Sequence, residues 1–270
     1  MKAFICALSD VRKEGEREEI DGLSSILLRH NVSVVHSRFI YTRGTGKQKA
    51  AELNSAITQA CTLVLDVSGG DSAHEVLPYL DSSLFKSSHA LFCGYSDLSC
   101  VVDTIAQEAG VPALLFQARN ITRSPTLESA FFDFITGKDG RLTAFPTTPV
   151  RAGAASGVLI GGNTRCTLKC PHLDFKGRIL LLEAYSGDAA RIAGLFHSYA
   201  ETGAFEEISG LILGTFTQAD RLGQRQDVIK SALALLPPST PVYETSSIGH
   251  GVDSMAALIG TAFHLGQEKA

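Results

Sequence analysis

The sequence lacks three features, whose presence would point to a membrane protein, a nucleic-acid-binding protein or a secreted disulfide-rich protein. No apolar stretch approaches the length needed to span a bilayer. The net charge is only −4, so there is no electrostatic reason to expect a nucleic-acid partner. The six cysteines lie mostly inside apolar runs and do not form a spaced disulfide framework. We therefore expect a cytoplasmic protein with reduced, buried thiols.

Two motif fragments are also incomplete. Residues 44–47 (Gly-Thr-Gly-Lys) resemble part of a phosphate-binding loop, but the required glycine is at the wrong spacing and Gln48 stands where Ser or Thr is needed. Cys166 and Cys170 have three residues between them and only His172 nearby, which is too few ligands for a zinc site. We expect no nucleotide bound by this loop, no metal ion and no other cofactor.

Short apolar runs alternate with amphipathic segments in the first half of the chain. Several of the apolar runs are apolar on consecutive residues, which is typical of strands buried on both faces. We predict strands at 3–8, 32–36, 62–67, 90–94 and 113–116, and helices at 16–30, 46–60, 72–81 and 98–109. This alternation predicts an α/β fold with a parallel sheet and flanking helices.

The composition changes over residues 138–157, where Pro, Gly, Thr and Ser are concentrated, and this predicts a linker. We therefore predict an N-terminal domain at 1–137 and a second, C-terminal α/β domain at 158–270. In the second domain we predict strands at 158–161, 178–183, 209–215 and 242–245, a Gly-Gly-Asn turn at 161–163, and helices at 188–202 and 224–236.

The apolar run at 91–94 ends in Gly94-Tyr95-Ser96, and a helical pattern follows at once. A strand, a sharp turn and a helix start expose a serine hydroxyl and direct backbone N–H groups toward the atom that it attacks, as in a nucleophile elbow. The second glycine of the common motif is absent, because Leu98 occupies its position. An ordinary loop is the alternative, and a nucleophile would need an acid, a base and an oxyanion site elsewhere in the chain.

Candidates for these groups occur further along. Glu183 is the last residue of a predicted buried strand, and carboxylates at such strand ends lie where ligands bind in open sheets. The alternative is that Glu183 is an ordinary exposed residue at the end of the strand. His250 lies between Gly249 and Gly251, where flexible backbone lets an imidazole project into a cleft. The Gly-Gly pair ending at Gly70 offers N–H donors for an oxyanion, although it could also serve simple chain reversal.

The ordered set of these motifs resembles the LD-carboxypeptidase family of serine peptidases, which includes the microcin C immunity peptidases. The residues that carry the resemblance are Gly69-Gly70, 76–81 (Val-Leu-Pro-Tyr-Leu-Asp), 94–97 (Gly-Tyr-Ser-Asp), 161–163 (Gly-Gly-Asn), 177–183 (Gly-Arg-Ile-Leu-Leu-Leu-Glu), Arg191-Ile192, 210–216 (Gly-Leu-Ile-Leu-Gly-Thr-Phe) and Gly249-His250. The resemblance implies that Ser96 is the nucleophile, Glu183 the acid and His250 the base. It also implies an oxyanion hole formed by backbone N–H groups of Gly70 and Asp97, and an active site at the interface between the two domains.

For function, the resemblance implies a serine carboxypeptidase that acts through an acyl-enzyme. Its substrate would be a murein tetrapeptide, whose C-terminal L-to-D peptide bond is cleaved to release D-alanine. The expected partner is thus a small muropeptide, with no nucleic acid and no membrane. The sequence leaves the oligomeric state open, a homodimer included.

Two alternatives remain open at this point. The first is a microcin C immunity-type peptidase that hydrolyses peptidyl or aminoacyl nucleotides; the sequence has no tryptophan to stack on an adenine, although Tyr or Phe could serve. The second is an inactive binding protein on the same scaffold, since fold does not set function. It is motivated by Glu75 and Gln117, which lie in segments where many LD-carboxypeptidases have Tyr-Gly-Ser-Asn-Arg and His-Gly-Pro. Changes there could alter specificity or abolish activity.

Overall fold

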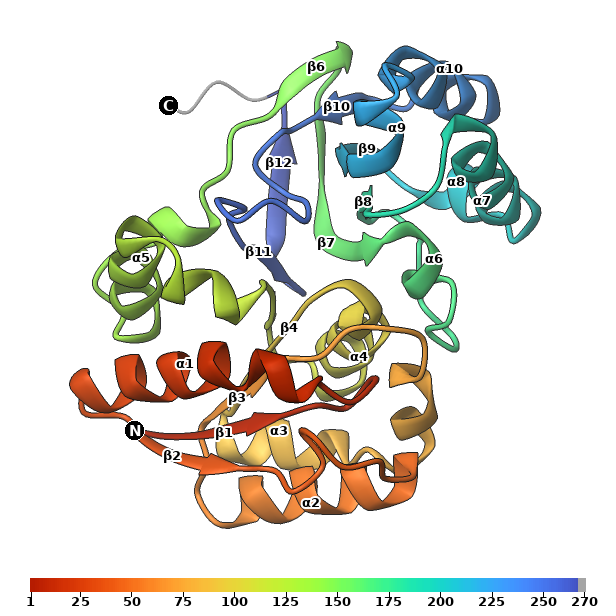
Figure 1. Cartoon of the computed structure of the whole chain (residues 1–270). Coiled ribbons are helices and arrows are strands. Elements are labelled where there is room, and N and C mark those ends of the chain that lie inside the picture. The colour runs from red at the N-terminus through yellow and green to blue at the C-terminus, as the bar shows by residue number, and fades with distance from the viewer. Residues whose placement is uncertain (267–270) are drawn as a thin grey trace.

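A computed structural model describes residues 1–266 and contains two six-stranded sheets with helices packed against them (Figure 1). In the first sheet the strand order is β11-β5-β4-β3-β1-β2, and β1 to β5 are parallel. Its strands are β1 (Lys2–Cys6), β2 (Ser33–His36), β3 (Leu63–Asp66), β4 (Leu91–Gly94), β5 (Ala113–Leu115) and β11 (Ala257–Ile259). All five strands predicted in the first half are present, and every residue of β3 is buried, as its apolar run predicts.

Helices cover both faces of the first sheet, as Figure 1 shows with α1 on one side and α2 and α3 on the other. The helices of the first half are α1 (Arg17–Arg29), α2 (Gly46–Thr58), α3 (Ser82–Ser88), α4 (Ser99–Thr104) and α5 (Pro125–Ile135), with short 3-10 turns η1 (Glu14–Glu16), η2 (Ala73–Tyr79), η3 (Ser96–Leu98), η5 (Ala118–Thr122) and η6 (Arg141–Thr143) and the π turn η4 (Ile105–Ala109). Leu23 of α1 and Phe131 of α5 share one core cluster, whereas Leu53 of α2 and Phe85 of α3 belong to another. Burial on both faces explains why β1, β3, β4 and β5 are largely apolar, whereas the edge strand β2 is mostly exposed.

The second sheet has the order β12-β7-β8-β9-β10-β6. Its strands are β6 (Thr148–Arg151), β7 (Ala155–Asn163), β8 (Ile179–Ala184), β9 (Gly210–Phe216), β10 (Val242–Glu244) and β12 (Ala262–Leu265), and its helices are α6 (Thr164–Thr167), α7 (Ala189–Glu201), α8 (Ala204–Glu207), α9 (Thr217–Arg221) and α10 (Arg225–Leu235). β7 to β10 are parallel, whereas β6 and β12 run antiparallel at the two edges. The α/β class predicted for both parts of the chain is therefore confirmed, with mixed sheets in both.

Alternate side chains of β8 contact the two halves of the molecule. Leu180 and Leu182 lie in the cluster beneath α7 and α10, whereas Ile179 and Leu181 lie in the cluster that also holds Phe92 of β4. Because successive side chains of a strand point to opposite faces, β8 packs against its own helices on one face and against the first half on the other. The interface between the halves is thus part of a continuous apolar core.

Parts of the predicted organisation differ in detail. The predicted division of the chain stays a prediction, but the predicted linker 138–157 contains β6, which pairs with β10, and the first residues of β7. The first sheet is not purely parallel, because β11 returns from the second half and pairs antiparallel with β5. These pairings follow from long-range contacts that local composition does not encode.

Three predicted elements also change character. The Gly-Gly-Asn segment at 161–163, predicted as a turn, is the end of β7, where Gly161 and Gly162 lie opposite Leu181 and Leu182 of β8. The helix predicted at 72–81 is 3-10 over Ala73–Tyr79, with Pro78 inside it lacking the N–H that a regular helix needs. The helix predicted at 98–109 ends as the π turn η4.

Candidate active site

Ser96 lies at a sharp corner between β4 and the helix that follows. Its φ angle of 59° is in the left-handed region, which non-glycine residues rarely adopt. Gly94 makes the corner possible, because a Cβ there would lie 2.8 Å from both Leu98 Cβ and Phe92 Cε1. Leu98, in the place of the common second glycine, thus packs against Gly94. The strand, the strained serine and the helix start have the geometry of a nucleophile elbow.

Glu183 is a fully buried carboxylate near the end of β8. Its Oε1 accepts a hydrogen bond of 3.1 Å from Asn163 Nδ2 at the end of β7. The backbone N–H of Asn163 donates to Ser99 Oγ at 2.8 Å, and the Ser99 hydroxyl donates to the Ser96 carbonyl at 2.7 Å. A chain of hydrogen bonds therefore connects Glu183 in the second half with the serine corner in the first.

His250 stands between Ser96 and Glu183. Its Nε2 lies 3.0 Å from Ser96 Oγ, and its Nδ1 lies 2.7 Å from Glu183 Oε2. A carboxylate only accepts, so the imidazole proton lies on Nδ1 and Nε2 is free to accept the serine proton. The structure thus brings together the three residues that the sequence predicts as nucleophile, base and acid, from three separate segments.

Neighbouring groups hold the His250 ring in place. Tyr95 packs edge-on against it with ring centroids 5.0 Å apart, and Tyr185 lies at 5.1 Å on a tilted plane. The Ser254 hydroxyl donates to the Gly249 carbonyl at 2.6 Å, which ties down the loop before the histidine. Burial and the neighbouring Glu183 carboxylate raise the pKa of the Tyr95 phenol. Tyr95 is thus a neutral group beside the imidazole.

The predicted oxyanion donors lie beside the serine. Gly69 and Gly70 line the same cavity as Ser96, and Gly70 has a φ angle of 137°. A Cβ at Gly70 would lie 2.8 Å from Asp10 Cβ, so this position requires glycine. Within residues 1–266, no backbone carbonyl accepts a hydrogen bond from the N–H group of Gly70 or of Asp97. Both donors are therefore available to a bound group.

The side chain of Asp97 is buried beneath this corner. Its Oδ2 accepts hydrogen bonds from Ser9 Oγ at 2.7 Å and from the Ala73 N–H at 2.8 Å, and its Oδ1 lies 2.7 Å from Lys169 Nζ. Burial by itself would raise the pKa of Asp97, but the bonds from Lys169, Ser9 and Ala73 outweigh it and lower the pKa. Asp97 thus ties the corner to Ser9, Ala73 and Lys169 through its carboxylate.

A cavity of about 760 Å³ opens over Ser96 and His250. Both halves of the chain contribute to it, and it is lined by residues 12, 13, 16, 68–70, 95, 96, 117, 119, 123, 163, 165, 184–186, 191, 195 and 250. Gln117, one of the two altered positions, lines this cavity, whereas Glu75 is an exposed residue outside its lining. A change in substrate contacts would therefore involve Gln117 and not Glu75.

The sequence does not predict several of these contacts. Ser99, Tyr185 and Lys169 carry no local signal, because a serine in a helix, a tyrosine after a strand and a lysine in a turn are ordinary. Asn163 belongs to the Gly-Gly-Asn motif that the chain shares with the family, but the motif assigns it no role. Its position directly after Gly161-Gly162 at a strand end is the signal that points to a contact with the site.

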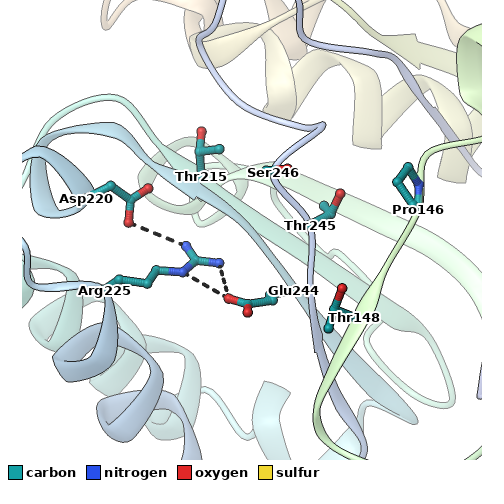
Figure 2. Close-up of a pocket in the computed structure, with 8 residues that line it drawn as sticks. All are labelled: Pro146, Thr148, Thr215, Asp220, Arg225, Glu244, Thr245 and Ser246. Carbon is teal, nitrogen blue, oxygen red and sulfur yellow. Dashed lines mark hydrogen bonds and ion pairs between the residues drawn. The ribbon is translucent and has the colours of Figure 1, made fainter.

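A second cavity, of about 410 Å³, lies beside the segment that leads to His250 (Figure 2). Arg225 lines this cavity. Its Nη2 and Nε atoms lie 3.0 Å and 3.2 Å from Glu244 Oε2, and its Nη1 donates a hydrogen bond of 2.7 Å to the Gly214 carbonyl. Asp220 lies 3.8 Å from the same guanidinium. Because protein groups already surround this cation, we interpret the cluster as a structural tie between the ends of β9 and β10 and the start of α10.

All six cysteines are buried and free, as their placement in apolar runs predicts. Among residues 1–266, no group of three or more His, Cys, Asp or Glu side chains is arranged to hold a metal ion. No helix in this described part of the chain is long and apolar enough to cross a membrane.

Sequence comparison places this geometry among known proteins. Residues 4–115 match the profile of the LD-carboxypeptidase N-terminal domain, and residues 156–265 match that of the LD-carboxypeptidase C-terminal domain. A Streptomyces coelicolor relative that bears the name of a carboxypeptidase is 24% identical over 244 residues, which cover 85% of this chain and 77% of the relative. A Bacillus subtilis relative that bears the name of a murein peptide carboxypeptidase is 22% identical over 235 residues, covering 82% and 74%.

The microcin C7 self-immunity protein MccF of Escherichia coli is 24% identical over 228 residues, covering 69% of this chain and 65% of that protein. Among solved structures, MccF in complex with glutamyl sulfamoyl guanosine superposes with a TM-score of 0.83 at 18% identity, covering 97% of this chain and 92% of that one. An MccF-like protein from Bacillus anthracis superposes with a TM-score of 0.80 at 18% identity, covering 99% and 94%. At this identity the structural likeness shows the fold alone.

Proposed function

Because the chain belongs to the LD-carboxypeptidase family of serine peptidases, we propose that it is a serine carboxypeptidase that releases D-alanine from a murein tetrapeptide. The bond cleaved would be the C-terminal L-to-D peptide bond, between a diamino acid and D-alanine. The observation that carries this proposal is the row Ser96–His250–Glu183, with contacts of 3.0 and 2.7 Å at the floor of a cavity.

In the first step, Ser96 Oγ attacks the scissile carbonyl carbon while its proton moves to His250 Nε2. Glu183 accepts the Nδ1–H of His250, which holds the required tautomer and stabilises the imidazolium that forms. Asn163 supports this arrangement by donating to the second oxygen of Glu183.

The tetrahedral intermediate carries its negative charge on the former carbonyl oxygen. In this proposal the N–H groups of Gly70 and Asp97 bind that oxygen, each contributing about 3 kcal/mol to transition-state stabilisation as in comparable sites. The left-handed conformation of Ser96 supports the assignment, because it turns the next peptide N–H toward the corner.

Collapse of this intermediate breaks the C–N bond, and the leaving amine of D-alanine takes the proton from His250. Water then donates a proton to His250 as it attacks the acyl ester of Ser96. The second tetrahedral intermediate releases the shortened peptide and returns the proton to Ser96. A small muropeptide is thus the proposed partner, and the six buried thiols support a cytoplasmic setting.

Mass spectrometry of a tetrapeptide digest tests this proposal. The wild-type protein should release D-alanine and leave the tripeptide, whereas Ser96→Ala should lower kcat by at least about 10⁴-fold. Full activity in Ser96→Ala would show that the mechanism is wrong. Labelling by a fluorophosphonate that is lost in Ser96→Ala would remove the alternative of an inactive binding protein.

Hydrolysis of aminoacyl nucleotides is a second candidate, favoured by the exposed aromatic ring of Tyr185. This ring is 54% exposed and lines the cavity beside His250, so it could stack on an adenine. A muropeptide and an aminoacyl sulfamoyl adenylate should therefore be offered separately to the purified protein. Release of D-alanine with the adenylate left intact would remove this candidate.

A further inference from the structure

The cavity over Ser96 is strongly cationic although the whole chain has a net charge of −4. Among the described residues, its lining contains six cationic side chains and a single carboxylate, that of Glu16. The cations are Arg12, Lys13, Arg119, Arg123, Arg165 and Arg191. The one terminal carboxylate that an exopeptidase must bind requires far less positive charge than this. Glu19 and Asp71, outside the lining, pair with three of these cations, so three positive charges remain after Glu16 is also counted. This remaining surplus indicates a further anionic group on the ligand.

Three of these cations come from the first half of the chain and lie close together, and two of them are largely buried. Arg12 follows β1, Arg119 lies in η5, and Arg123 directly follows η5. The side chains of Arg12 and Arg119 are only 13% and 14% exposed. We call Arg12, Arg119 and Arg123 the arginine cluster.

The arginine cluster carries more charge than its protein partners neutralise. Arg119 lies 2.8 Å and Arg123 2.6 Å from the same carboxylate, that of Glu19, and Arg12 pairs with Glu16. Three guanidinium groups thus share two carboxylates, which leaves a formal charge of +1.

The packing of the cluster makes this excess charge costly. Burial and then the neighbouring charge of Arg119 lower the pKa of Arg12. The Nε atoms of Arg12 and Arg119 are buried and have no acceptor within the part of the chain that the structure describes. Desolvated like charges with unused donors destabilise the empty site, and a bound anion would relieve that repulsion.

From this arrangement we propose that the arginine cluster is a specificity site for a second carboxylate of the substrate, separate from its C-terminal one. The planar fork of arginine binds a carboxylate through two parallel hydrogen bonds. The formal charge of +1 on the three arginines and their two carboxylates by themselves matches one carboxylate. This inference rests on the proposed carboxypeptidase function, since it concerns the substrate of the same site.

A set of tetrapeptides tests the inference, with each internal carboxylate replaced in turn by its carboxamide. For the wild-type protein, one of these replacements should lower kcat/KM by about tenfold or more, because a charged hydrogen-bond partner is lost. In Arg119→Gln and in the more exposed Arg123→Gln, the acid and the amide should be cleaved at similar rates. Arg38→Gln is the matched control, since Arg38 is a 73% exposed arginine outside the cavity, and it should keep the wild-type preference.

Thermal unfolding of each variant separates loss of specificity from loss of folding. Equal cleavage of all acids and amides by the wild-type protein would overturn the inference while leaving the carboxypeptidase proposal intact. Preference for a phosphorylated peptide over the carboxylate peptide would overturn the choice of carboxylate.

A binding measurement keeps the inference testable if no tetrapeptide is cleaved, an outcome that would contradict the proposed function itself. Calorimetric titration of Ser96→Ala with the same peptides should show about tenfold tighter binding of the acid than of the amide. That difference should disappear in the double variant Ser96→Ala/Arg119→Gln. Equal affinities in Ser96→Ala would overturn the inference independently of catalysis.

Discussion

Two buried aspartates, Asp97 and Asp103, lie in the first turns after Ser96. Their pKa values shift in opposite directions, because Asp97 has more hydrogen-bond donors than Asp103. The Asp97 carboxylate accepts hydrogen bonds from Ser9, Ala73 and Lys169, and these bonds lower the pKa of Asp97. Asp103 receives the Gly161 N–H at 2.8 Å on one oxygen, and its other oxygen has no partner within residues 1–266. Burial therefore raises the pKa of Asp103 to about 7.

Asp103 should make the stability of the protein pH-dependent. Its carboxyl titrates near 3.8 in an unfolded chain and near 7 in the fold, so the folded state binds an extra proton between these values. The free energy of unfolding should therefore decrease as the pH rises from about 4 to 7, by on the order of 3 kcal/mol. Urea denaturation of Asp103→Asn, which keeps the acceptor for Gly161, should show a gain in stability over wild type that is larger at about pH 8 than at about pH 4.

The exposed Asp21 of α1 supplies the control for this measurement. Asp21→Asn should leave the pH profile of stability unchanged. If Asp103→Asn followed the wild-type profile at every pH, the pH dependence would not come from Asp103.

At the scale of elements, Arg225 joins three of them near the His250 segment. It starts α10 and contacts Glu244 at the end of β10 (Figure 2). It also donates to the carbonyls of Gly214 and Leu213 in β9. Its side chain is 23% exposed, so its ion pair is partly screened by water. The tie stabilises the end of the sheet from which the segment carrying His250 leaves.

Replacement of Arg225 should weaken the contacts among β9, β10 and α10 and so lower the stability of the protein. Arg225→Met should lower the free energy of unfolding by about 2 kcal/mol, between the values typical of exposed and of buried ion pairs. Lys230→Met, on the same helix with a 74% exposed side chain, should change it by no more than about 0.5 kcal/mol. Chemical denaturation of both variants measures the difference, and equal losses would show that Arg225 is not a structural tie.

At the scale of the whole molecule, the site depends on how closely β7 approaches the helix after Ser96. Gly162 has a φ angle of 152°, and a Cβ there would lie 3.0 Å from Ser99 Cβ and from Leu115 Cδ1. The next residue, Asn163, donates its N–H to Ser99 and its amide to Glu183. A displacement of β7 would therefore separate Glu183 from the serine corner.

Gly162→Ala should push the two halves apart at this contact. We expect a loss of about 2 kcal/mol or more in the free energy of unfolding, from the strained φ angle and from overpacking, together with a lower kcat. Gly194→Ala, at a position of α7 with no heavy atom within 4 Å of the added Cβ, should be neutral or slightly stabilising. Wild-type kcat in a folded Gly162→Ala protein would show that catalysis tolerates a wider separation of the halves.

Local features of the chain were accessible from the sequence alone. The apolar runs predicted β1 to β5 and β7 to β10, because burial on two faces demands continuous apolar residues in most of these strands. The edge strands β6, β11 and β12 were not predicted. The Gly94-Tyr95-Ser96 corner, the glycines around His250 and the strand end at Glu183 were likewise visible, since backbone freedom and chain reversal depend on neighbouring residues. These local features made Ser96, His250 and Glu183 candidates, and the resemblance to the LD-carboxypeptidase family implied their roles.

Tertiary structure alone decided how distant segments meet. Ser96 and His250 are 154 positions apart, and the return of β11 to the first sheet and the contact of Lys169 with Asp97 leave no periodic signal in the chain. The arginine cluster is similar, because Arg12 and Arg119 are 107 positions apart and come together only in the fold, where η5 packs against α1. Such contacts depend on the packing of side chains across a shared core, and local propensity does not specify which surfaces will meet.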